Sequence, residues 1–111
     1  MKASELRLKN WCSIDGVETC VRKQEIIVIL KNNKKIEPIM LTEEWLINFR
    51  FKKDINGYFL GILSFSITSQ NEFMICINDI SIQTICKYVH QIQNLYFALM
   101  GVELPLSSNF A

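Results

Sequence analysis

The strongest pattern of apolar positions lies near the end of the chain, from Ile85 to Met100. At the helical period, its apolar side chains fill an arc roughly twice the ~100° that a surface helix needs. The pattern therefore predicts a long helix over 85–100 that packs on more than one side. Gly101 follows at the position where many helices end on a residue in the left-handed conformation.

The first forty residues have the pattern of short strands. Asp15-Gly16 is a strong two-residue hairpin signal, and a loop there places Trp11 opposite Cys20. The stretch Glu25 to Lys31 is β-branched and apolar on both faces, which predicts a central strand, and Asn32-Asn33 predicts the next turn. Together these strands predict a small, bent antiparallel sheet or a partial barrel.

A short helix and a run of hairpins are predicted in the middle of the chain. Thr42 is a good N-cap, and Glu43 and Glu44 follow it in the first turn, so we expect a helix over about 42–51. Asn56-Gly57 signals a hairpin, and the alternation over 63–68 is that of a strand with one wet face. The sequence thus predicts a β-meander between the two helices.

We assign the chain to the α+β class as a single domain of residues 1–111. Its strand-rich half spans 1–40, and the short helix, the meander and the C-terminal helix span 41–104. The chain has 111 residues, of which half are hydrophobic, so it is long enough to bury a core without disulfides.

Charge and hydropathy limit the classes of partner. The net charge of +1 disfavours a nucleic-acid binder, although Lys31, Lys34 and Lys35 form one local basic cluster. Arg50, Lys52 and Lys53 form another. The longest apolar run, 26–30, is too short to span a membrane. We expect a soluble protein in the cytoplasm of its host cell.

No residue set spells out a reaction. The sequence contains no nucleophile elbow, no P-loop, no dinucleotide fingerprint and no zinc-protease motif. Its four cysteines show no CxxC pair, so we expect buried, reduced thiols. We therefore predict a protein that is not an enzyme, with no metal and no cofactor.

Two polar residues of the predicted C-terminal helix need an explanation. His90, the single histidine, lies at the edge of the apolar arc, where it is either a hydrogen-bonded boundary residue or a ligand contact. Gln93 lies inside the arc, and a buried amide without partners costs ~1–3 kcal/mol. We expect Gln93 to bond the backbone of an adjacent sheet, rather than its counterpart across a helix pair.

Three segments carry a resemblance to a known family: the segment 5–11 (ELRLKNW), the segment 38–46 (PIMLTEEWL) and the segment 87–104 (KYVHQIQNLYFALMGVEL). They resemble small proteins of phages and prophages of gut bacteria that read LRIGN, PIPLTEEWLLKFGF and KYVHQLQNLYFALTGEEL. This chain departs from the pattern at Met100 and in its apolar tail. The resemblance implies a small phage accessory protein, of the kind that often blunts host defence, and assigns no functional residue.

These features lead to two hypotheses of function. The first is a protein that sequesters a small anionic immune signal such as a cyclic nucleotide. The second is an inhibitor that covers a host defence protein. For the first, tyrosine stacking and a bidentate arginine–phosphate pair are the chemistry expected. The candidate ligand-binding residues are Trp45, Arg50, Tyr58, Lys87, His90 and Asn94.

The apolar arc also predicts self-association. One flank of the C-terminal helix, formed by Tyr88, Leu95 and Leu99, lies well away from the centre of the arc. Either the N-terminal strands or a second subunit must cover it, because monomers rarely leave a large apolar patch exposed. We expect a symmetric homodimer or higher even oligomer built partly on this flank.

Overall fold

The computed structural model describes residues 6–22, 24–25, 35–78 and 80–106. This part of the chain has the predicted α+β architecture, with a three-stranded sheet, a five-stranded sheet and a C-terminal helix. The elements are β1 (Trp11–Ile14), β2 (Val17–Cys20), β3 (Ile36–Glu37), α2 (Glu43–Asn48), β4 (Lys52–Asp54), β5 (Gly57–Leu60), β6 (Leu63–Ile67), β7 (Phe73–Ile77), β8 (Ile80–Cys86) and α3 (Val89–Met100). None of the described helices is long and apolar enough to span a membrane.

The N-terminal sheet has the strand order β2-β1-β3. Its hairpin is confirmed: Asp15 and Gly16 both have positive φ, 49° and 86°, and Trp11 pairs with Cys20. The described strands form an open sheet that does not close into a barrel. Of the strand expected over Glu25 to Lys31 only the first residue is described, and the turn at Asn32-Asn33 lies outside the described residues.

Helix α2 begins as its sequence predicts. The Thr42 side chain accepts a hydrogen bond from the amide of Trp45, and Glu43 and Glu44 occupy the first turn. The helix ends at Asn48 with Phe49 as its C-cap, earlier than the expected end near residue 51. Arg50 then takes a positive φ of 69°, which turns the chain into β4.

The five-stranded sheet is a meander with the order β4-β5-β6-β7-β8. Its first hairpin forms where predicted, but the two-residue loop is 55–56, one residue before the Asn56-Gly57 signal. The Asp54 carboxylate accepts hydrogen bonds from the amides of Asn56 and Gly57 and fixes this turn. Gly57 is thereby the first residue of β5, and a Cβ built on it would lie 1.9 Å from the carbonyl oxygen of Phe65.

The predicted start of the C-terminal helix at Ile85 is wrong. Ile85 and Cys86 belong to β8, where they pair with Met74 and Phe73 of β7. The helix begins at Val89. The side chain of Gln91, in its first turn, accepts hydrogen bonds from the amides of Lys87 and Tyr88 and so caps the start of the helix. Apolar residues that continue a helical pattern are thus drawn into the sheet ladder by tertiary pairing. The C-terminal prediction holds, because Gly101 caps the helix at φ 74°.

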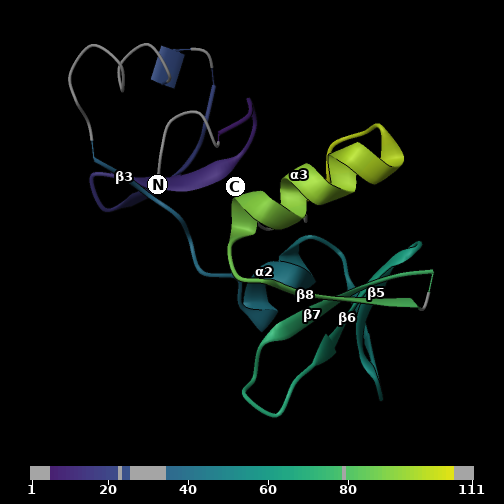
Figure 1. Cartoon of the computed structure of the whole chain (residues 1–111). Helices are drawn as coiled ribbons and strands as arrows, with labels where there is room; N and C mark the ends of the chain where they lie inside the picture. Colours follow the sequence, from purple (N-terminus) through teal and green to yellow (C-terminus); the bar gives the residue numbers. More distant parts are fainter. Residues whose placement is uncertain (1–5, 23, 26–34, 79, 107–111) are drawn as a thin grey trace.

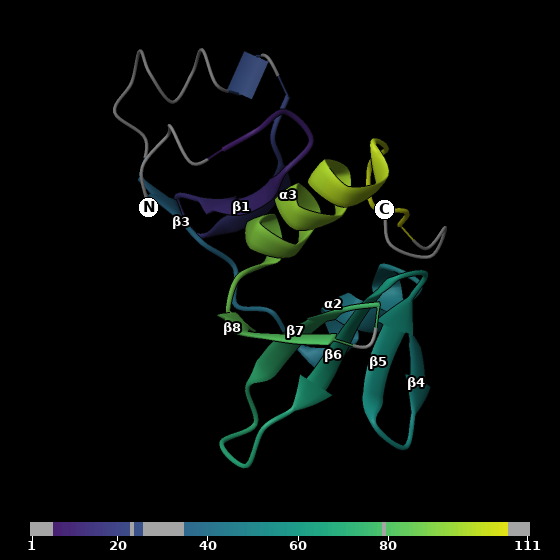
Figure 2. The same ribbon diagram turned by 45° about the vertical axis from the view of Figure 1, so that its right-hand side comes forward.

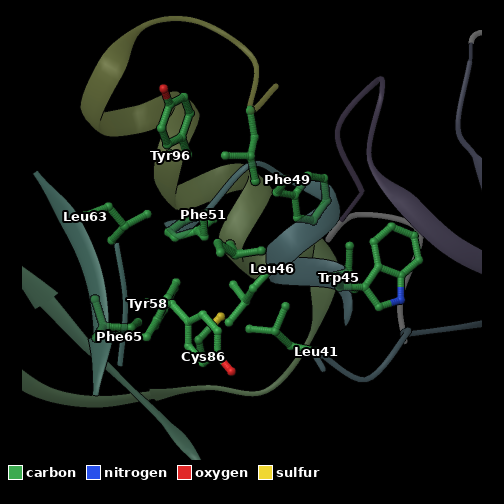
Figure 3. Close-up of a cluster of buried hydrophobic side chains, with 14 of the residues drawn as sticks. Leu41, Trp45, Leu46, Phe49, Phe51, Tyr58, Leu63, Phe65, Cys86 and Tyr96 are labelled. Atoms are coloured by element: carbon green, nitrogen blue, oxygen red, sulfur yellow. The ribbon is translucent and has the colours of Figure 1, made fainter. Parts of the chain in front are cut away.

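Helix α3 lies between the two sheets, with the N-terminal sheet on one side and the meander on the other (Figures 1 and 2). The main core fills the space between α2, α3 and one face of the meander (Figure 3). Phe49, Phe65 and Leu46 are almost completely buried there, and each contributes about 1.5–3 kcal/mol of burial free energy. Packing within the chain therefore accounts for much of the wide apolar arc.

Candidate functional site

Two of the predicted ligand residues on α3 contact the rest of the chain. His90 is buried and its ring stacks on that of Tyr88, with centroids 6.0 Å apart. The Asn94 side-chain oxygen accepts hydrogen bonds from Arg7 Nε at 3.0 Å and from Asn10 Nδ2 at 2.9 Å. The polar side of α3 therefore forms hydrogen bonds with the N-terminal segment of the same chain.

A polar clamp joins the N-terminal segment to α3 and the residues after it; we define it as Arg7, Asn10, Gln93, Asn94 and Glu103. The Arg7 guanidinium pairs with the Glu103 carboxylate through two nitrogens, one of them at 3.1 Å. Gln93 donates to the carbonyl of Lys9 at 3.1 Å and accepts from the amide of Trp11 at 2.8 Å. The prediction that Gln93 bonds the backbone of a sheet is confirmed.

The six predicted ligand residues lie on three separate parts of the described chain. Trp45 is buried in α2, with ring centroids 5.6 Å from both Trp11 and Phe49. Arg50 is exposed in the turn after α2, and Lys87 is exposed just before α3. Tyr58 lies on β5, and His90 and Asn94 lie in α3. The structure does not bring these six residues together in one site, and ligand binding by them stays a prediction.

Tyr58 lies in a second group of ionisable side chains, away from the polar clamp. Its hydroxyl donates a hydrogen bond to the Glu43 carboxylate. The Lys53 ammonium lies 3.4 Å from the same carboxylate and 5.9 Å from the centre of the Tyr58 ring. Three elements, α2, β4 and β5, therefore bring an anion, a cation and a phenol together.

The protonation states of Tyr58 and Glu43 are fixed at neutral pH. Burial, and then the hydrogen bond to Glu43, raise the pKa of Tyr58 to about 12, so the hydroxyl remains a donor. The hydrogen bond from Tyr58, followed by that from Lys53, lowers the pKa of the Glu43 carboxyl, which is therefore ionised. The result is a carboxylate held at the surface by a buried hydroxyl.

A shallow groove of about 490 Å³ contains this group; we call it the Tyr58 groove. Its rim carries Ile55, which is 99% exposed at the tip of the β4–β5 hairpin, and Ile67, which is 43% exposed. Phe73 lines it as well, with its ring 6.2 Å from that of Tyr58. Asp54 adds a second carboxylate to the lining, so the groove suits a cation or an apolar group better than a phosphate.

The opposite side of the meander is the open sheet face, which we define as Lys52, Phe59, Ser64, Cys76 and Ser81. The register places these five residues in a single row across all five strands. A depression of about 570 Å³ on this side is lined by three of them, Phe59, Ser64 and Cys76. A cation, an aromatic ring and a hydroxyl thus lie on neighbouring strands.

The cysteines behave as reduced thiols. All four are free, and Cys12 and Cys86 are buried whereas Cys20 and Cys76 are half-buried. Burial raises the pKa of Cys12, and it raises the pKa of Cys86 to about 12. Such thiols are protonated at neutral pH and are poor nucleophiles.

The residues predicted to form a dimer interface are partly used within the chain. Tyr88 is half-buried beside His90 and forms a bridge with Met40, and Leu95 packs against the main core. Leu99 is 36% exposed, and Met100 next to it is 42% exposed. The homo-oligomer stays a prediction.

No family model, no curated protein and no solved structure matches this chain. Its function must therefore be inferred from the geometry of its surfaces. Sequence reasoning selected Tyr58 but missed Glu43, Lys53 and Ile55, because Glu43 is explained by the helix start and Lys53 by a solvated turn. The available signal was Ile55 itself, an aliphatic residue directly before a turn signal.

Proposed function

We propose that this protein is a non-enzymatic accessory protein that binds a host protein and blocks it. The observation that supports this most is Ile55, an aliphatic side chain 99% exposed at a hairpin tip. Turn positions are mostly occupied by Gly, Pro, Asn, Asp and Ser, so an aliphatic residue at the tip is unusual. An isoleucine at this position gains nothing from folding, whereas its burial by a partner contributes about 1.5–3 kcal/mol.

The surroundings of Ile55 support a docking surface rather than a single stray side chain. Ile67 and Phe73 line the same groove, and Glu43 and Asp54 provide charge at its side. Interfaces commonly combine buried apolar anchors with a polar rim in this way. The resemblance to phage accessory proteins supports a host defence effector as the class of target.

The first test replaces Ile55 by Asp. A protein that co-purifies with the tagged chain from host cells is identified, purified and titrated against the wild type and the variant. Ile55→Asp should weaken its binding at least about tenfold, since a charge would then enter an apolar contact. The variant should keep the wild-type melting temperature, because Ile55 is solvated in the free protein.

Val17→Asp is the matched control. Val17 is 64% exposed on the β1–β2 hairpin, so the substitution introduces the same negative charge at an exposed position on a different sheet. Unchanged binding of the control supports docking at the Tyr58 groove. Equal affinity of wild type and Ile55→Asp for the purified partner would refute it.

A second candidate function is the sequestration of a small anionic signalling nucleotide. The observation that favours it is the open sheet face, where Lys52, Phe59 and Ser64 lie on adjacent strands. An exposed aromatic ring on a sheet can stack on a base, and a neighbouring lysine can pair with its phosphate. In this candidate function, the open sheet face takes the place of the six ligand-binding residues expected from the sequence, which lie on separate parts of the chain.

Isothermal titration with cyclic and linear nucleotides tests this second candidate. If it is correct, Phe59→Ala and Lys52→Gln should each weaken binding about tenfold, as expected for loss of a stacking or charged contact. Lys53→Gln removes the same charge from the next residue on β4 and should have little effect. Absence of binding by the wild type would exclude the nucleotide candidate and leave the protein-binding proposal intact.

A further inference from the structure

The Tyr58 groove already holds a cation from its own chain. The Lys53 ammonium lies 3.4 Å from a Glu43 carboxylate oxygen and 5.9 Å from the centre of the Tyr58 ring. A carboxylate beside an aromatic ring is a favourable environment for a primary ammonium. The internal ion pair therefore shows which chemistry the groove accepts.

The two members of this ion pair are held to different degrees. Glu43 interacts with the hydroxyl of Tyr58, a residue that is 4% exposed and packs in the core. Among the described residues, the Lys53 ammonium contacts only the Glu43 carboxylate and, at 5.9 Å, the Tyr58 ring, and the Lys53 side chain is 65% exposed. Exposed lysine–carboxylate pairs contribute little free energy, so the lysine is readily displaced while the carboxylate stays in place.

The carboxylate also has capacity for another donor. Its two oxygens offer about four acceptor positions, and the hydroxyl of Tyr58 and the ammonium of Lys53 occupy two. The Glu43 side chain is 53% exposed, so the remaining positions face solvent. Asp54 on the same groove adds negative charge.

We propose that the Tyr58 groove binds a lysine side chain presented by the partner protein, which takes the place of Lys53 on Glu43 and Tyr58. This inference rests on the proposed function and names what its docking surface recognises. The partner's ammonium pairs with Glu43, its methylene groups cover the edges of Tyr58 and Phe73, and Ile55 and Ile67 pack against the surrounding apolar surface. Lys53 is then an internal competitor.

The test uses a blocked glycine pentapeptide with a central lysine, titrated into the intact protein and followed by NMR. The expected result is a shift of the Tyr58, Phe73 and Asn71 signals with weak affinity. Lys53→Ala should bind the peptide about two- to fivefold more tightly, the range of one surface ion pair. Glu43→Gln keeps an acceptor for Tyr58 but lacks the negative charge, and this variant should lose most of its affinity for the peptide.

Two controls separate specific displacement from general electrostatics. Lys52→Ala removes the same charge on the opposite side of the sheet, so its affinity should equal that of the wild type. The peptide with Nε-acetyllysine should not bind. Equal gains from Lys52→Ala and Lys53→Ala, binding of the acetylated peptide, or no shift in any variant would each overturn the inference.

The outcomes also distinguish this inference from the proposed function. A purified partner whose binding depends on Ile55 but is unchanged by Glu43→Gln would overturn the lysine inference and leave the proposed function standing. A partner insensitive to Ile55→Asp would refute the proposed docking surface. The peptide titration would still report whether the groove itself binds an ammonium.

Discussion

Replacement of Gly57 by alanine is expected to lower the free energy of unfolding by about 3–6 kcal/mol, by adding backbone strain to a steric clash. The residue has φ 144°, a conformation that side-chain-bearing residues rarely adopt. Its Cβ would lie 1.9 Å from the carbonyl oxygen of Phe65. Phe65 is 1% exposed on a central strand, so its backbone cannot move aside cheaply. Such a loss is a large share of the ~5–15 kcal/mol that stabilises a domain.

Gly61→Ala separates the clash from the backbone strain. Gly61 also has a positive φ, 61°, but a Cβ added there would meet no other atom within 4 Å. The control should therefore cost only about 1–2 kcal/mol. Urea denaturation of both variants measures the difference. Equal destabilisation by the two substitutions would show that the approach of β5 to β6 is not the constraint at Gly57.

Replacement of Gln93 by leucine should destabilise the protein by about 2–5 kcal/mol and loosen the N-terminal sheet from α3. Leucine fills a similar volume but leaves the amide of Trp11 without its acceptor, and the carbonyl of Lys9 keeps only the thiol of Cys20 as a donor. Each buried unsatisfied group costs about 1–3 kcal/mol. Denaturation gives the total, and hydrogen exchange at the Trp11 amide reports the local release.

Gln91→Leu makes the same chemical change two residues earlier on the same helix. Gln91 is exposed and accepts hydrogen bonds from the amides of Lys87 and Tyr88, so its loss removes a cap worth about 1 kcal/mol. The Trp11 amide should stay protected in this variant. If Gln93→Leu left that amide as protected as in the wild type, the polar clamp would not be what holds the N-terminal sheet.

The features predicted correctly from the sequence are those determined by a few neighbouring residues. The Asp15-Gly16 hairpin, the Thr42 cap and the Gly101 terminus each depend on local backbone chemistry. The role of Gln93 was predictable for a related reason. A buried amide within an apolar arc must find hydrogen-bond partners, and a sheet backbone provides them.

The features that were missed depend on contacts between distant residues. Ile85 and Cys86 continue the helical pattern, but pairing with β7 places them in a strand. The candidate ligand residues of α3 were assigned to an external partner, whereas Arg7 and Asn10 contact Asn94. The Tyr58 groove gathers side chains from three elements, and no spacing along the chain reveals that arrangement.

The polar clamp has a consequence for the order of folding. Arg7 bonds Asn94 and Glu103 across 87 and 96 residues of sequence, whereas the strands of the meander pair with their immediate neighbours. Contacts that close long loops cost more chain entropy and form later. During synthesis at roughly 5–20 residues per second, the first hairpin must wait on the order of 5–20 s for its docking helix. The N-terminal sheet is therefore synthesised well before the helix on which it docks.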